Sequence, residues 1–203
     1  PNAADKLKKI YNGYPIVESE LPIAKAKDTF NFGLVARGIP EKGWEPAIQA
    51  FIQIPNEDVR LYLYCEGEYI NGLKEKYSDP RIVYAGFTDN PLQAISNFDV
   101  GLLPSYYSSE SLPTTIIEYL AMNKPVIATN VGEISKMILP ENESPPAGLI
   151  IGTIDPIKMV QPLNEAMVRM FTDKQLYEAM KASCKPSFNK FSMKGCVDEY
   201  VKE

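Results

Sequence analysis

Residues 99–129, DVGLLPSYYSSESLPTTIIEYLAMNKPVIAT, contain the pattern that decides the fold class. A short apolar run at 100–103 precedes a Ser/Tyr-rich loop, a helical pattern over 112–123 and a second apolar run at 125–129. Compact apolar runs are typical of strands in a parallel sheet that is covered on both faces, because neither face meets water. This stretch therefore predicts a β-α-β unit of a parallel sheet.

The same alternation extends in both directions along the chain. We expect strands near residues 30–36, 60–65, 82–85, 100–103, 125–129 and 148–151. Helical patterns lie at 43–54, 69–77, 91–97, 112–123, 133–139, 156–171, 173–183 and 192–201. Such alternation favours right-handed crossovers, and about six parallel strands is the count of a Rossmann-like, three-layer α/β/α domain.

Composition excludes several classes of function. The chain of 203 residues has a net charge of −5, so it carries no broad basic surface for nucleic acid. It contains no histidine, which excludes a Ser-His-Asp triad, a Cys-His dyad and a His-ligated zinc within this chain. Its three cysteines form no Cys-x-x-Cys motif and favour a reducing compartment. The longest apolar runs are far shorter than the ~20 residues of a membrane helix.

Two cations follow the first predicted strand. In the segment VARGIPEKG at 35–43, Arg37 and Lys42 lie just before a helix, at the mouth of the sheet. Two cations beside a helix N-terminus can bind a diphosphate, although an ordinary solvated loop would carry the same charges. The chain has neither a Walker A motif nor Gly-x-Gly-x-x-Gly, which argues against a dinucleotide-binding domain.

The helix predicted over 112–123 carries a narrow polar stripe on an otherwise apolar surface. Thr114, Thr115 and Glu118 form that stripe, so we expect Glu118 to be mostly buried. A buried carboxylate needs donors, which ribose hydroxyls, a lysine or backbone amides would supply.

The start of this helix is a second candidate for anion binding. We expect Ser111 to be the N-cap, and the free amides near Leu112, Thr114 and Thr115 could bind phosphate oxygens. Glu110 precedes the helix and should reach a different part of the same ligand.

Two further loops carry polar or aromatic groups. Gly67 follows the second strand and permits a positive φ, whereas Glu66 and Glu68 fit a polar turn better than a metal pair. Tyr106 and Tyr107 follow the fourth strand, where packing is a commoner role for paired tyrosines than stacking on a ligand.

The ordered segments resemble the C-terminal, donor-binding domain of GT-B glycosyltransferases, above all the large retaining family 4. The resemblance runs from about residue 7 to the end, through GLVARGIPEKGWEPAIQAF, LYLYCEGE, RIVYAGF, DVGLLPS, ESLPTTIIEYLAMNKPVIATNVGEISKMI and GLII. The segment IYNG at 10–13 is similar to the interdomain hinge, and FSMKGCVDEYVKE at 191–203 to the closing helix. The resemblance implies an interdomain linker at 1–28, a Rossmann-like donor domain at 29–185 and a crossover helix at 186–203.

The resemblance also implies residue roles. Arg37 and Lys42 would bind the donor diphosphate together with the amides of Leu112, Thr114 and Thr115, and Glu118 would bind the ribose. Glu110 would contact the transferred sugar and take part in catalysis. The region of Gly67, Phe87 and Thr88 would hold the base. The sequence departs from the family at Cys65 and Ala36, where glycine is usual, and in a longer loop at 104–110.

The implied function is sugar transfer from a nucleoside-diphosphate sugar to a glycan or lipid-linked acceptor, with retention and without a metal or other cofactor. We expect the acceptor domain to lie outside this chain, so the isolated chain should not turn over. A cytoplasmic location is expected, compatible with peripheral association at the membrane face, and no nucleic acid is expected as a partner. Two alternatives remain at this point: a non-catalytic nucleotide-binding module of the same fold, and half of a sugar-nucleotide 2-epimerase.

Overall fold

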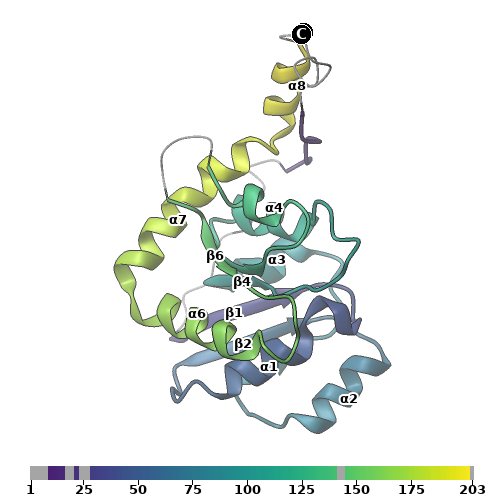
Figure 1. Cartoon of the computed structure of the whole chain (residues 1–203), viewed down its shortest axis with the longest axis vertical. Helices are drawn as coiled ribbons and strands as arrows, with labels where there is room; N and C mark the ends of the chain where they lie inside the picture. Colours follow the sequence, from purple (N-terminus) through teal and green to yellow (C-terminus); the bar gives the residue numbers. More distant parts are fainter. Residues whose placement is uncertain (1–8, 17–20, 23–27, 141–144, 202–203) are drawn as a thin grey trace.

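The computed structural model describes residues 9–16, 21–22, 28–140 and 145–201. Its centre is a six-stranded, all-parallel sheet in the order β3-β2-β1-β4-β5-β6 (Figure 1). The strands are β1 (Phe30–Val35), β2 (Val59–Tyr64), β3 (Ile82–Tyr84), β4 (Val100–Leu103), β5 (Val126–Thr129) and β6 (Gly148–Ile151). The predicted strands and the Rossmann-like fold class are confirmed.

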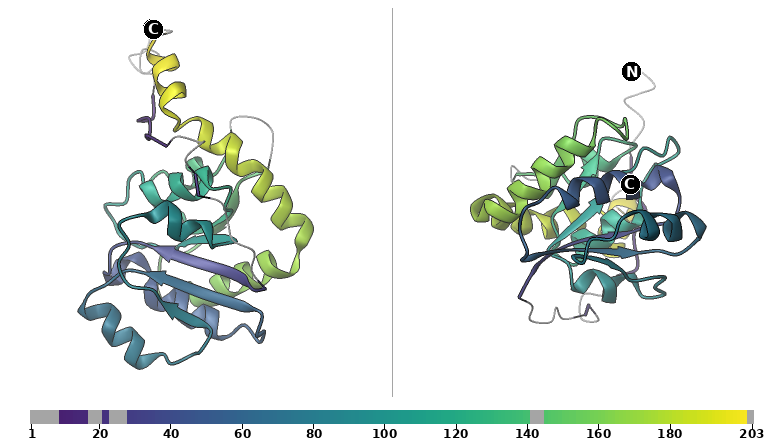
Figure 2. Two further views of the ribbon diagram at one scale, coloured as in Figure 1. Left: turned by 180° about the vertical axis from the view of Figure 1, so that it is seen from behind. Right: turned by 90° about the horizontal axis from the view of Figure 1, so that it is seen from below.

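Helices cover both faces of the sheet (Figure 2). The helical elements are η3 (Pro40–Lys42), α1 (Trp44–Ile52), α2 (Glu68–Lys76), α3 (Pro91–Ser96), α4 (Thr114–Ala121), α5 (Ile134–Met137), α6 (Val160–Thr172), α7 (Lys174–Asn189) and α8 (Met193–Val201). Residues of α1, α2 and α6 belong to one hydrophobic core, and residues of α3, α4 and α5 to the other. Helix α7 contributes Met180 to the first core and Cys184 and Phe188 to the second.

The two central strands bring two glycines together. Gly33 of β1 lies opposite Gly101 of β4 in the register. A Cβ at Gly33 would lie 2.2 Å from the Phe98 ring, and one at Gly101 would lie 2.4 Å from the Tyr119 ring. The two rings, whose centroids are 6.4 Å apart, therefore fill the space that side chains on these strands would need.

Several helix boundaries differ from the prediction: α6 begins at Val160 rather than near 156, and α1, α4 and α5 end about two residues early. Two further differences, at the start of α4 and the end of α7, have a visible cause. The prediction of Ser111 as N-cap was wrong, because α4 begins at Thr114 with Pro113 as its N-cap and without a side-chain cap. The Ser111 carbonyl instead accepts the amide of Glu133 at 3.0 Å. Helix α7 also continues past residue 183 through Pro186, because its last turns bury Ser187 and Phe188.

A short part of the predicted linker packs beside the junction of α7 and α8. Tyr14 forms an isolated parallel bridge with Ser192, and its amide donates to the Phe191 carbonyl at 2.7 Å. The Tyr11 ring lies 4.9 Å from the Phe191 ring. In Figure 1 this segment lies next to α8, which projects beyond the body of the sheet. Residues 1–8, 17–20 and 23–27 of the predicted linker lie outside the described residues.

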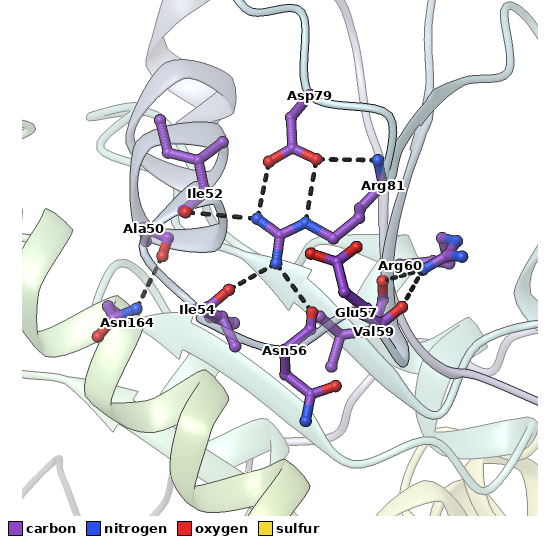
Figure 3. Close-up of polar contacts among 10 residues, drawn as sticks. All are labelled: Ala50, Ile52, Ile54, Asn56, Glu57, Val59, Arg60, Asp79, Arg81 and Asn164. Atoms are coloured by element: carbon purple, nitrogen blue, oxygen red, sulfur yellow. Dashed lines mark hydrogen bonds and ion pairs between the residues drawn. The ribbon is translucent and has the colours of Figure 1, made fainter.

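The amino ends of the strands carry a polar cluster around Arg81 (Figure 3). The buried Arg81 guanidinium donates to the Asp79 carboxylate at 2.7 and 3.0 Å, and to the carbonyls of Ile54 at 2.5 Å and Asn56 at 2.9 Å. These bonds connect the chain leaving α1 to the start of β3, on the side of the sheet away from the predicted ligand site.

Candidate functional site

The strand order reverses between β1 and β4, and ligands in open parallel sheets bind at such a point, beyond the carboxyl ends of the strands. A cavity of about 420 Å³ lies there, lined by the loops after β1, β2 and β3 and by α4. The predicted site residues that line this cavity are Arg37, Phe87, Thr88, Thr114, Thr115 and Glu118. The cavity is also lined by Tyr64, Glu66 and Pro91, for which no ligand contact was predicted.

Glu118 is the buried acid that the polar stripe predicted. The residue is 7% exposed, and its Oε1 accepts a hydrogen bond of 2.6 Å from the Tyr14 hydroxyl. Burial raises the pKa of the Glu118 carboxyl above its ordinary 4.5, and the bond from Tyr14 partly offsets that rise. Burial and the same carboxylate raise the pKa of the Tyr14 hydroxyl, so Tyr14 remains a donor at neutral pH. Linker composition gave no sign of this contact.

Lys42 and Glu110 form a buried ion pair beside the cavity. Their side chains are 9% and 8% exposed, and the Lys42 ammonium donates to Glu110 Oε2. The Ser105 hydroxyl lies 2.9 Å from the same carboxylate oxygen. Neither residue lines the cavity itself, and both are engaged with each other across the loops after β1 and β4.

Gly43 sets the position of Lys42. It adopts φ 77°, ends η3 and is the N-cap of α1. A Cβ on this residue would lie 2.1 Å from the Pro104 carbonyl oxygen. The left-handed conformation and the close approach both require glycine, and together they bring the loop after β1 against the loop after β4.

Tyr107 connects the two predicted phosphate-binding cations. The Arg37 guanidinium carbon lies 5.2 Å, and the Lys42 Nζ 5.1 Å, from the centroid of its ring. The Trp44 indole donates to the Arg37 carbonyl at 2.9 Å, which fixes the loop, while the Arg37 side chain is exposed. Attraction between a ring face and a cation holds both positive groups near one another.

The first turn of α4 faces the cavity with its threonines. Because α4 has no side-chain cap, its first amides remain available to an anion. The Thr115 hydroxyl donates to the Val35 carbonyl at 3.3 Å, and Thr114 is exposed. Leu112 does not line the cavity, because its side chain packs against the core under α4.

The predicted base region is only partly assembled. Phe87 is 68% exposed at the rim of the cavity and Thr88 lies beside it. Gly67 has the expected positive φ, 122°, and starts α2, but it does not line the cavity. Cys65 lines the cavity, and burial raises the pKa of its thiol to about 12.

Two absences among the described residues bear on other chemistries. No three His, Cys, Asp or Glu side chains in this part of the chain are grouped so as to hold a metal ion. None of its helices has both the length and the apolar composition needed to cross a bilayer.

Residues 29–173 match the family described as glycosyl transferases group 1, and the chain belongs to that family. Its fold is that of the C-terminal domain of GT-B glycosyltransferases, as the resemblance implied. An uncharacterized glycosyltransferase of Methanocaldococcus jannaschii is 31% identical over 110 residues, which cover 51% of this chain and 27% of the relative.

Three solved structures show the same fold at lower identity. Anabaena HepE with UDP and glucose has a TM-score of 0.72 and 18% identity, covering 86% of this chain and 48% of HepE. The pneumococcal O-GlcNAc transferase GtfA, with UDP and GlcNAc, has a TM-score of 0.71 and 18% identity, covering 95% of this chain and 37% of GtfA. Sucrose-phosphate synthase of Thermosynechococcus elongatus has a TM-score of 0.65 and 24% identity, covering 86% of this chain and 44% of the synthase. The chain thus spans less than half the length of each of these proteins.

Proposed function

We propose that this chain is the donor-binding part of a retaining, metal-independent glycosyltransferase that uses a nucleoside-diphosphate sugar. The observation that carries the proposal is one cavity that combines Arg37, the uncapped start of α4 and the buried carboxylate of Glu118. Cations and helix amides suit a diphosphate, and a carboxylate suits the hydroxyls of a ribose.

The chemistry follows from where charge develops. As the bond from the sugar to the diphosphate breaks, negative charge accumulates on the leaving phosphate. Arg37, the α4 amides and, once its ion pair with Glu110 has opened, Lys42 would stabilise this charge more strongly in the transition state than in the ground state, without a metal. Glu110 would contact the transferred sugar. The solved structures of HepE and GtfA contain UDP, which supports a UDP-sugar as the first donor to test.

The acceptor and the location of the reaction belong to this proposal as well. A glycan or a lipid-linked sugar would bind to a part of the protein outside this chain, at the cytoplasmic side of the membrane. The isolated chain would bind donor but would not transfer sugar.

A non-catalytic nucleotide-binding module is the second candidate, and one observation favours it. Lys42 and Glu110 are buried against each other, and the Ser105 hydroxyl lies 2.9 Å from Glu110 Oε2. If this pair persists when nucleotide binds, Glu110 does not reach a sugar.

Calorimetric titration of the chain with UDP, GDP, ADP and dTDP in EDTA tests the donor site. We expect saturable binding of one nucleotide, weakened at least about tenfold in Arg37→Ala because a charge-assisted contact to phosphate is lost. Arg169→Ala, which removes another exposed arginine on α6, is the matched control and should bind normally. A folded chain that binds no nucleotide, or equal losses in both variants, would contradict the proposal.

A further inference from the structure

The predicted linker reaches into the site through one hydroxyl. Tyr14 lies 104 residues before Glu118 in the chain, yet its hydroxyl donates to Glu118 Oε1 at 2.6 Å. Among the described residues, Tyr14 is the one side chain that forms a hydrogen bond with this carboxylate. The acid that faces the cavity is therefore held by a residue from outside the sheet and its helices.

Tyr14 is itself fixed by backbone contacts. Its amide donates to the Phe191 carbonyl at 2.7 Å, and it pairs with Ser192 at the start of α8. The ring of Tyr11, three residues earlier in the chain, packs on the Phe191 ring with the centroids 4.9 Å apart. The position of the Tyr14 hydroxyl is thus set by the junction of α7 and α8.

The two oxygens of the Glu118 carboxylate have different roles. A carboxylate has two oxygens and several acceptor sites, and one oxygen of Glu118 is bonded to Tyr14. A glutamate side chain rotates readily about its last torsion unless a partner holds it. A fixed donor on Oε1 therefore orients Oε2 for hydroxyl groups that enter the cavity.

We propose that Tyr14 is a positioning residue for the donor site, which orients the Glu118 carboxylate to accept hydrogen bonds from the ribose hydroxyls of the nucleotide. This inference rests on the proposed function. It adds a link between the segment at 9–16, the start of α8 and the ligand, so that a shift of either segment changes nucleotide affinity. The bond also favours the ionised form of Glu118, which is the form that accepts two ribose hydrogen bonds.

The test compares nucleotides with and without the ribose hydroxyls. Tyr14→Phe removes the hydroxyl and keeps the ring, so the linker should still pack. We expect Tyr14→Phe to weaken binding of UDP, GDP or ADP, whichever the wild type binds, by about three- to tenfold. Binding of the matching 2′,3′-dideoxy nucleotide should change by less than about twofold, because that ligand does not use the carboxylate.

Two further variants control the comparison. Tyr11→Phe removes a linker hydroxyl bonded to a carboxylate outside the cavity, and it should leave both affinities unchanged. In a Glu118→Gln background, Tyr14→Phe should have little further effect on ribonucleotide binding, since the two groups act as one unit.

Each outcome separates this inference from the proposed function. Equal loss of affinity for both kinds of nucleotide would show that Tyr14 only stabilises the fold, and no loss for either would show that it does not act on the ligand. Both results overturn the inference and leave the donor site standing. A folded wild type that binds neither kind of nucleotide overturns the proposed function and this inference with it.

Discussion

At the scale of single residues, two glutamates that are close in sequence have different partners. Glu110 is paired with the Lys42 ammonium, whereas Glu118 is bonded to the neutral Tyr14 hydroxyl. Burial raises the pKa of the Glu118 carboxyl despite the bond from Tyr14, so its protonation should respond to mild acid.

Nucleotide affinity should fall on acidification through the raised pKa of Glu118, which lies above 4.5. Protonation removes the carboxylate that accepts the ribose hydrogen bonds, so the contribution of Glu118 to affinity is complete at higher pH and is lost as pH drops through that pKa. Calorimetric titrations in steps down from pH 8 measure this profile. In Glu118→Gln the acid-dependent loss should disappear, and an unchanged profile in that variant would contradict the assignment.

The raised pKa of Glu118 makes stability depend on pH in the direction opposite to nucleotide affinity. The native state binds the Glu118 proton more tightly than the unfolded chain, so the free energy of unfolding decreases as pH rises from 4.5 through the raised pKa. Urea unfolding across this window should show that slope in the wild type and a shallower one in Glu118→Gln.

Breaking the Lys42–Glu110 pair should be costly. Lys42→Met leaves the Glu110 carboxylate buried without its cation and should lower the free energy of unfolding by about 3 kcal/mol. The double variant Lys42→Met/Glu110→Leu should recover much of this loss, because no uncompensated charge remains. Urea unfolding of the wild type, Lys42→Met, Glu110→Leu and the double variant gives a double-mutant cycle. Purely additive losses in the free energy of unfolding would argue against a buried pair.

The site residues differ in how far sequence could predict them. The burial of Glu118 was predictable, because the stripe it shares with Thr114 and Thr115 lies on one helix whose geometry is regular. The Lys42–Glu110 pair joins two loops 68 residues apart, and the Tyr14 contact depends on how an irregular segment packs. No local periodicity reports contacts of this kind.

At the scale of elements, the strands matched the prediction because each is a compact apolar run between polar turns. The errors concern helix ends, where tertiary contacts override local preference. Pro113 and the bond from Glu133 to the Ser111 carbonyl shift the start of α4. Burial of Phe188 extends α7 through Pro186, at which a helix would ordinarily stop.

Gly43 and Gly72 should respond oppositely to alanine. Gly43→Ala places a Cβ against the Pro104 carbonyl at a left-handed position and should lower the free energy of unfolding by about 2–3 kcal/mol. Gly72→Ala, inside α2 with open space around it, should raise it by about 0.5–1 kcal/mol. Thermal or urea unfolding measures both, and a tolerated Gly43→Ala would contradict the described contact between the loops after β1 and β4.

At the scale of the whole molecule, the two ends of the sheet have separate tasks. The carboxyl ends carry the cavity, and the amino ends carry the Arg81 cluster, whose bonds are all to this chain's own carboxylate and carbonyls. The alternation of apolar runs and helical patterns predicted a parallel sheet. The strand order that places the cavity was not predicted, because right-handed crossovers are compatible with several orders of six strands. The Arg81 cluster was not predictable, because its acceptors are mostly backbone.

Arg81→Met should therefore affect stability and spare binding. It leaves buried carbonyls and Asp79 without their donor, and we expect a loss of about 3 kcal/mol in the free energy of unfolding. Arg60→Met, which removes a more exposed arginine that also bonds to carbonyls, should cost about 0.5 kcal/mol or less. Nucleotide affinity of folded Arg81→Met should equal that of the wild type, and a large change would contradict this separation.

The paired glycines at the centre of the sheet have a consequence for how this sequence can diverge. Gly33 and Gly101 face each other across β1 and β4, and the rings of Phe98 and Tyr119 occupy the space above them. A larger residue at either strand position requires a smaller one in place of the matching ring. In sequences that diverge from this one, a larger residue at 33 should therefore occur together with a smaller one at 98, and likewise for 101 and 119. A substitution at one position of a pair alone should be selected against.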